Sequence, residues 1–186
     1  MSAESEAFLE DRFLAELFGL EELRIGRHRQ RDTLKAPNML WVQYYWVVEV
    51  IPSFHPRSVL AGIKAVEDGK QFENASLDGW PKIAYLTEDS NHVLSIGDDD
   101  VAASLHTFDI LPVMGMLALD GICYKLGFSS LDVTGEMRIL NPSQPSQIKL
   151  QSMLLRSANM VAEASQDIRL REAIKIWCEY APGIVG

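Results

Sequence analysis

The chain has 186 residues, of which 47% are hydrophobic and 23% charged, and its formal net charge is −9. This length and hydrophobic content predict one globular domain over residues 1–186 and exclude a disordered chain. The negative charge repels phosphate backbones and anionic lipid head groups, so we expect neither nucleic acid nor a membrane surface as a partner.

The first predicted element is an amphipathic helix. Apolar residues from Phe8 to Phe18 recur at helical spacing, which predicts a helix packed on a sheet. The preceding residues are acidic and no long apolar segment follows, so a secretory signal is not indicated. We therefore expect a cytoplasmic protein, with Cys123 and Cys178 as buried free thiols.

A basic segment, RIGRHRQR, follows this helix. It brings four arginines into eight positions: Arg24, Arg27, Arg29 and Arg31. Arginine engages carboxylates and phosphates with two hydrogen bonds at once, so the segment is predicted to bind a partner. The alternative is that these arginines only neutralise acidic regions of the same molecule. His28, inside the segment, is expected in solvent.

The run LWVQYYWVVEVI predicts a long central strand over about residues 39–51. Simple alternation places its even-numbered side chains, from Leu40 to Val50, on one face. A strand of this length would span roughly 40 Å, comparable to the diameter of the domain, so a bend or bulge is expected. Beyond it, Pro56 and the spacing of Val59, Leu60, Ile63 and Val66 predict a helix that ends near Gly69.

The middle of the chain predicts a hairpin, with strands over residues 82–87 and 92–97. Residues 98–107 fit either a third strand or a short helix capped by one of three consecutive aspartates. Asp109 is expected to cap a buried helix over residues 110–126.

The last third predicts a strand and two helices. Residues 131–140 alternate strictly, with Leu131, Val133, Met137 and Ile139 inward and with Asp132, Thr134, Glu136 and Arg138 outward. One helix then carries an apolar face from Leu150 to Val161, and a second carries one from Leu170 to Trp177.

These elements predict an α+β fold. Strands occur as hairpins and helices gather at the ends, without the strand–helix alternation of a parallel sheet. We expect a mostly antiparallel sheet of about four or five strands, with the long strand 39–51 in its centre, and about four or five helices.

Histidines are the candidate chemical groups, because histidine titrates near neutral pH and binds metals. If Asp98, Asp99 and Asp100 form a three-residue hairpin loop, His92 lies directly opposite His106, with Asp109 as a third ligand. A helix over these residues would separate the pair. His55, next to Pro56, is a further candidate at a predicted strand-to-helix corner.

No sequence motif specifies a reaction. The GxSxG, GxGxxG and GxxxxGK[ST] patterns and the spacings of metal ligands are missing from the sequence, so we predict no metal and no cofactor. The preferred hypothesis is a non-enzymatic protein that binds another protein or itself, as an adaptor, inhibitor, immunity or assembly factor does. The alternative is a small enzyme or ligand-binding domain with a histidine-containing pocket between the sheet and helix 110–126.

Overall fold

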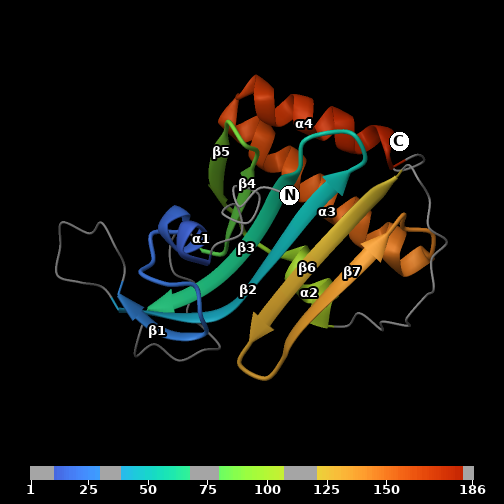
Figure 1. The fold of residues 1–186 in the computed structure, drawn as a ribbon. Helices are drawn as coiled ribbons and strands as arrows, with labels where there is room; N and C mark the ends of the chain where they lie inside the picture. The colour runs from blue at the N-terminus through green and yellow to red at the C-terminus, as the bar shows by residue number, and fades with distance from the viewer. Residues whose placement is uncertain (1–10, 30–38, 68–79, 107–120, 182–186) are drawn as a thin grey trace.

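The computed structural model describes residues 11–29, 39–67, 80–106 and 121–181. Its helices are α1 (Asp11–Leu17), α2 (Asp100–His106), α3 (Pro145–Ser165) and α4 (Ile168–Glu179). Its strands are β1 (Gly26–Arg29), β2 (Met39–Pro52), β3 (Ser58–Glu67), β4 (Lys82–Leu86), β5 (Asn91–Ser95), β6 (Ile122–Ser130) and β7 (Thr134–Leu140). The predicted α+β class is confirmed (Figure 1).

The strands form one antiparallel sheet in the order β5-β4-β3-β2-β6-β7, and β1 pairs with β2. Among the described residues the sheet therefore has seven strands, more than the four or five that were predicted. β1 pairs with residues 39–42 of β2, and β6 pairs with residues 44–52, so both lie along the same side of β2. The strand β7 pairs only with β6 among the described residues, and it forms one outer edge of the sheet.

The long central strand is confirmed, and it contains a bulge. Val42 pairs with Ala65 but Tyr44 pairs with Lys64, so Gln43 is an extra residue on β2. A bulge of this kind reverses which side chains face each side of the sheet. Val42 consequently packs with α1, whereas Trp46 packs with α3 and α4. The prediction that all even-numbered residues share one face is therefore wrong.

The helix predicted after Pro56 is also wrong, because residues 58–67 form β3. Leu60 is buried on one face of the sheet, and Val59 and Ile63 are buried on the other. A strand covered on both faces is apolar at almost every position, and such a run also matches helical spacing.

The helix predicted over residues 110–126 is likewise wrong at its C-terminal end. Residues 122–126 lie in β6, and Tyr124 and Leu126 face α3 and α4. Asp109 and the remainder of that predicted helix lie outside the described residues.

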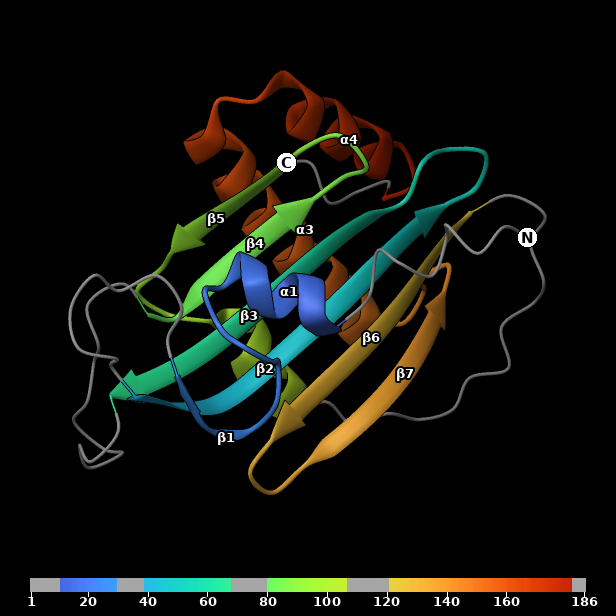
Figure 2. The same ribbon diagram turned by 60° about the vertical axis from the view of Figure 1, so that its left-hand side comes forward.

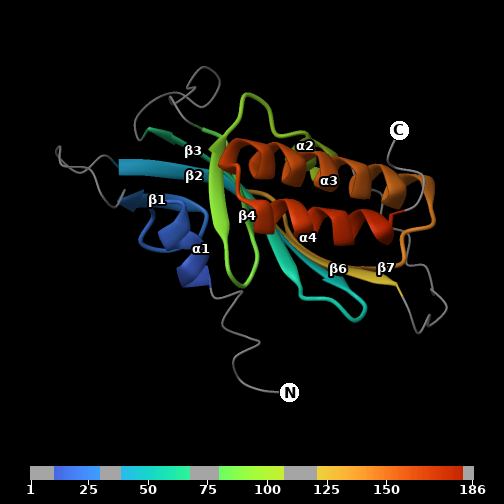
Figure 3. The ribbon, with the colours of Figure 1, turned by 90° about the horizontal axis from the view of Figure 1, so that it is seen from above.

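Helices cover the sheet from two sides. Figure 3 shows α3 and α4 on one side and α1 on the other. The two C-terminal helices are confirmed with the predicted inward faces, since Leu150, Leu154, Leu170 and Trp177 are fully or almost fully buried. No helix among the described residues is long and apolar enough to span a membrane.

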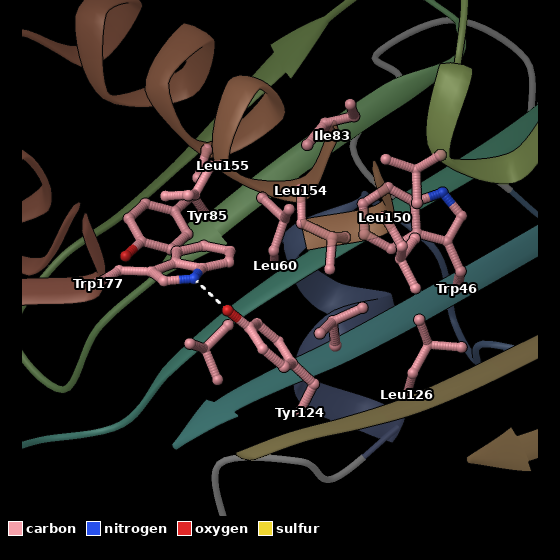
Figure 4. Packing of buried hydrophobic residues seen from close by; sticks show 14 of the residues in the cluster. Trp46, Leu60, Ile83, Tyr85, Tyr124, Leu126, Leu150, Leu154, Leu155 and Trp177 are labelled. Atoms are coloured by element: carbon pink, nitrogen blue, oxygen red, sulfur yellow. Dashed lines mark hydrogen bonds between the residues drawn. The ribbon is translucent and has the colours of Figure 1, made fainter. Parts of the chain in front are cut away.

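A polar network lies within the larger core. The Tyr124 hydroxyl oxygen accepts hydrogen bonds from Trp177 Nε1 and Gln151 Nε2, each at 2.6 Å. Figure 4 shows the bond from Trp177. Burial raises the pKa of Tyr124 above its ordinary value, so this hydroxyl stays neutral. The network ties α3 and α4 to β6 and fixes how the helix layer sits on the sheet.

The buried hydrophobic residues form two clusters, one between the sheet and α3 and α4 and one between the sheet and α1. Both clusters share the same sheet, and the single domain over residues 1–186 stays a prediction.

Candidate functional site

The histidine pair predicted from a hairpin is overturned. Residues 100–106 form α2, so His106 belongs to a helix and has no strand partner. His92 lies in β5, where it pairs with Tyr85. His55 lies apart from both, exposed in the β2–β3 connection with its ring edge-on to Tyr180. Among the residues that the structure describes, no group of three His, Cys, Asp or Glu side chains can hold a metal ion.

Asp99 explains why this segment is helical. Its Oδ1 accepts a hydrogen bond from the backbone N–H of Ala102 at 3.0 Å, as an N-cap does. Its Oδ2 accepts from Trp46 Nε1 at 2.8 Å and from the Tyr44 hydroxyl at 3.1 Å. The second of the three aspartates is therefore a buried structural cap, which joins α2 to the central strand.

The arginine-rich segment is a short strand for part of its length. β1 includes Arg27 and the backbone of Arg29, while Arg31 lies outside the described residues. His28 is 4% exposed and its Nε2 donates to the carbonyl oxygen of Arg24, so the prediction that His28 is solvated is wrong. Arg24 is ion-paired with Glu22 at 2.8 Å.

The pocket predicted between the sheet and helix 110–126 loses part of its wall, because residues 122–126 belong to the sheet. A hollow of about 650 Å³ instead lies on the face of the sheet that α1 covers. It lies over β2, β6 and β7, with Leu14 of α1 at its side. Figure 2 shows this face, with α1 in front of β2 and β3.

Strand pairing arranges the side chains of the hollow in rows. One row joins Glu49 of β2, Lys125 of β6 and Arg138 of β7, which are successive cross-strand partners. A second row joins Tyr45, Ser129 and Thr134. The Ser129 and Thr134 hydroxyls lie 3.0 Å apart.

Glu49 is a charged residue in a buried position. Its side chain is 1% exposed, and Arg57 Nη1 lies 2.6 Å from Oε1. Lys125 Nζ lies 3.1 Å from Oε2, at ion-pair distance but without hydrogen-bond alignment. A buried carboxylate is stable only when cations and donors compensate for the lost water. Glu49 therefore fixes Arg57 and holds Lys125 at the floor of the hollow.

Glu136 and Arg138 lie on the same face of β7, two residues apart and both exposed. Arg138 Nε donates to Cys123 Sγ at 3.1 Å. Within the described part of the chain, neither Glu136 nor Arg138 forms an ion pair. The hollow thus presents one carboxylate and one guanidinium at the β7 edge of the sheet, which no other described strand covers.

Exposed apolar side chains lie at both ends of β7. Leu131 is 56% exposed, Val133 52% and Leu140 43%. The prediction that Leu131 and Val133 point inward is wrong, because both lie in the turn that precedes β7. Met137 and Ile139, on the strand itself, face the core as predicted.

The backbone of β7 also faces outward at alternate residues. Asn141 N donates to Ile122 O and Ser130 N donates to Val133 O, so the odd-numbered residues 133 and 141 direct their backbone groups toward β6. In a regular antiparallel pair this alternation continues along the strand. Thr134, Glu136, Arg138 and Leu140 therefore direct their N–H and C=O groups away from β6, toward the outer edge.

The sequence had predicted the outward side chains of β7 correctly, but it could not show that β7 is an edge strand. That position follows from the order of the strands, which the assignment of residues 122–126 to a helix concealed. Comparisons with protein-family models, with curated proteins and with solved structures find no match to this chain.

Proposed function

We propose that this protein acts without catalysis, by binding another protein or a second copy of itself along the outer edge of β7 and the adjoining hollow. One observation carries the proposal: the edge strand β7, whose outer side pairs with no other described strand, bears Glu136 and Arg138, which form no ion pair among the described residues. Exposed Leu131, Val133 and Leu140 flank the same edge.

An open edge is a template for another strand. Its free backbone groups hydrogen-bond to an added strand, and the side chains on either face give specificity. Here Arg138 supplies a cation for an acidic side chain of the partner, and Leu140 supplies apolar contact. This combination supports the binding of a protein segment.

The arginine-rich segment is a second proposed surface. Arg24 and Arg27 are exposed, which supports a role in binding. The ion pair between Arg24 and Glu22 favours the alternative, in which the arginines neutralise acidic residues of the same chain. The edge of β7 has the stronger support, because backbone and side-chain groups are both available there.

Location in the cytoplasm remains a proposal. Its support is that Cys123 and Cys178 are both free thiols, as is typical of proteins in reducing compartments.

Photo-crosslinking tests which surface is used. p-Benzoylphenylalanine in place of Val133 or Leu140 is expected to yield a defined crosslinked product in the cells that naturally make the protein. The same residue in place of Ile168, which is 67% exposed on α4, is the matched control and is expected to yield none. A third position, Arg27, tests the arginine-rich segment. Products at Arg27 or Ile168 but not at Val133 or Leu140 would contradict the proposal.

A further inference from the structure

We infer that the partner at β7 is a second copy of this chain, paired antiparallel about a two-fold axis that passes through Met137. The inference rests on the proposed function, and it names the partner and its register. It follows from the direction of the backbone groups, from the length of β7 and from the order of its charges.

Backbone direction limits the possible registers. The even-numbered residues of β7 direct their N–H and C=O groups outward, so in a paired edge each must face an even-numbered residue of the other copy. A two-fold axis through residue 136, 137 or 138 satisfies this condition. The axis through Met137 is the one that overlaps all of Thr134–Leu140 with its copy. That overlap gives about eight backbone hydrogen bonds between the two strands.

Charge selects the same register. With the axis at Met137, Glu136 lies opposite Arg138 of the second copy, and Arg138 lies opposite its Glu136. Directly opposed unlike charges stabilise an antiparallel pair, and like charges destabilise it. An axis at residue 136 would oppose two glutamates, and an axis at residue 138 would oppose two arginines.

The two-fold axis also decides how the hollows are placed. It runs perpendicular to the sheet, so both copies keep Glu136 and Arg138 on the same face. The second copy extends the sheet, and the two hollows become neighbours on one continuous surface. Leu140, which is 43% exposed in the single chain, then lies opposite Thr134 of the other copy.

Charge reversal tests this register by sedimentation analysis of the purified full chain. The wild-type chain is expected to pass from monomer to dimer over about three decades of concentration around the micromolar range. Glu136→Arg opposes arginine with arginine, and Arg138→Glu opposes glutamate with glutamate. Each is expected to weaken the dimer about 30-fold.

Mixing the two single variants restores the dimer, because every opposed pair then has unlike charges. The double variant Glu136→Arg/Arg138→Glu is expected to dimerise as the wild type does, for the same reason. Glu172→Arg, an equal change of charge on α4, is the matched control and leaves the dimer unchanged. Glu136 and Arg138 are both exposed, so each variant is expected to fold, and thermal unfolding of each variant checks this.

The outcomes separate the inference from the proposed function. A wild-type chain that stays monomeric, or a dimer that survives both single reversals, overturns the inferred pairing. If that chain still crosslinks to a different protein through Leu140, the proposed function stands without the self-pairing. If it is monomeric and forms no crosslink at Val133 or Leu140, both are overturned.

Discussion

Trp46→Ala is expected to lower the free energy of unfolding by about 4 kcal/mol. Trp46 is 0% exposed, and its indole N–H donates to the buried carboxylate of Asp99 at 2.8 Å. Its ring fills the space beside Gly62, where an added Cβ would lie 2.3 Å from the ring. The substitution therefore leaves a large cavity and removes one of the hydrogen bonds that Asp99 accepts.

Chemical denaturation measures this change, and two variants separate its causes. Trp46→Phe keeps most of the ring volume but loses the N–H donor, so it is expected to cost about 1.5 kcal/mol. Phe54→Ala truncates an aromatic side chain that is 87% exposed, and it is expected to cost less than about 0.5 kcal/mol. A cost for Trp46→Ala close to that of Phe54→Ala would show that Trp46 does not organise the core.

Arg57→Met is expected to lower the free energy of unfolding by about 3 kcal/mol, because it leaves the Glu49 carboxylate buried with Lys125 as its remaining ion-pair partner. Arg57 is itself mostly buried, with 21% of its side chain exposed. Lys125 is 51% exposed, so Lys125→Met is expected to cost only about 1 kcal/mol.

A double-mutant cycle in urea measures the coupling directly. Glu49→Leu removes the charge that needs compensation, so the pair Glu49→Leu/Arg57→Met is expected to be more stable than Arg57→Met alone. Additive costs in the cycle would mean that Glu49 and Arg57 do not interact, and they would contradict the account of the floor of the hollow.

Local patterns predicted the elements whose two faces differ in environment. The helices α3 and α4 have one buried face each, and β7 alternates between core and solvent, so their periodicity is clear in the sequence. The strand β3 is buried on both faces because α1 covers one side of the sheet and α3 and α4 cover the other, whereas β6 contributes to the core on the α3 and α4 face. That burial is a property of the tertiary fold, and a helical interpretation fitted the same residues.

The sequence predicted which side chains of the candidate site are exposed, but it did not predict where in the sheet they lie. The alternation of Glu136, Met137 and Arg138 indicates an exposed face from the order of residues alone. The edge position of β7 depends on which strands pair. Glu49 is charged, so the sequence did not indicate that its side chain is buried. His28 shows the same limit, since its hydrogen bond to the backbone of Arg24 depends on how the chain folds around β1.

Amide hydrogen exchange along β7 tests the central claim, that its outer edge is a binding surface. The N–H groups of Met137 and Ile139 point toward β6, so their exchange is expected to be slow at every protein concentration. The N–H groups of Glu136 and Arg138 point outward, so their exchange is expected to be fast in dilute solution and to slow as the chain is concentrated. Equal exchange at all four residues, or outward amides that are unaffected by concentration and by any crosslinked partner, would contradict the claim.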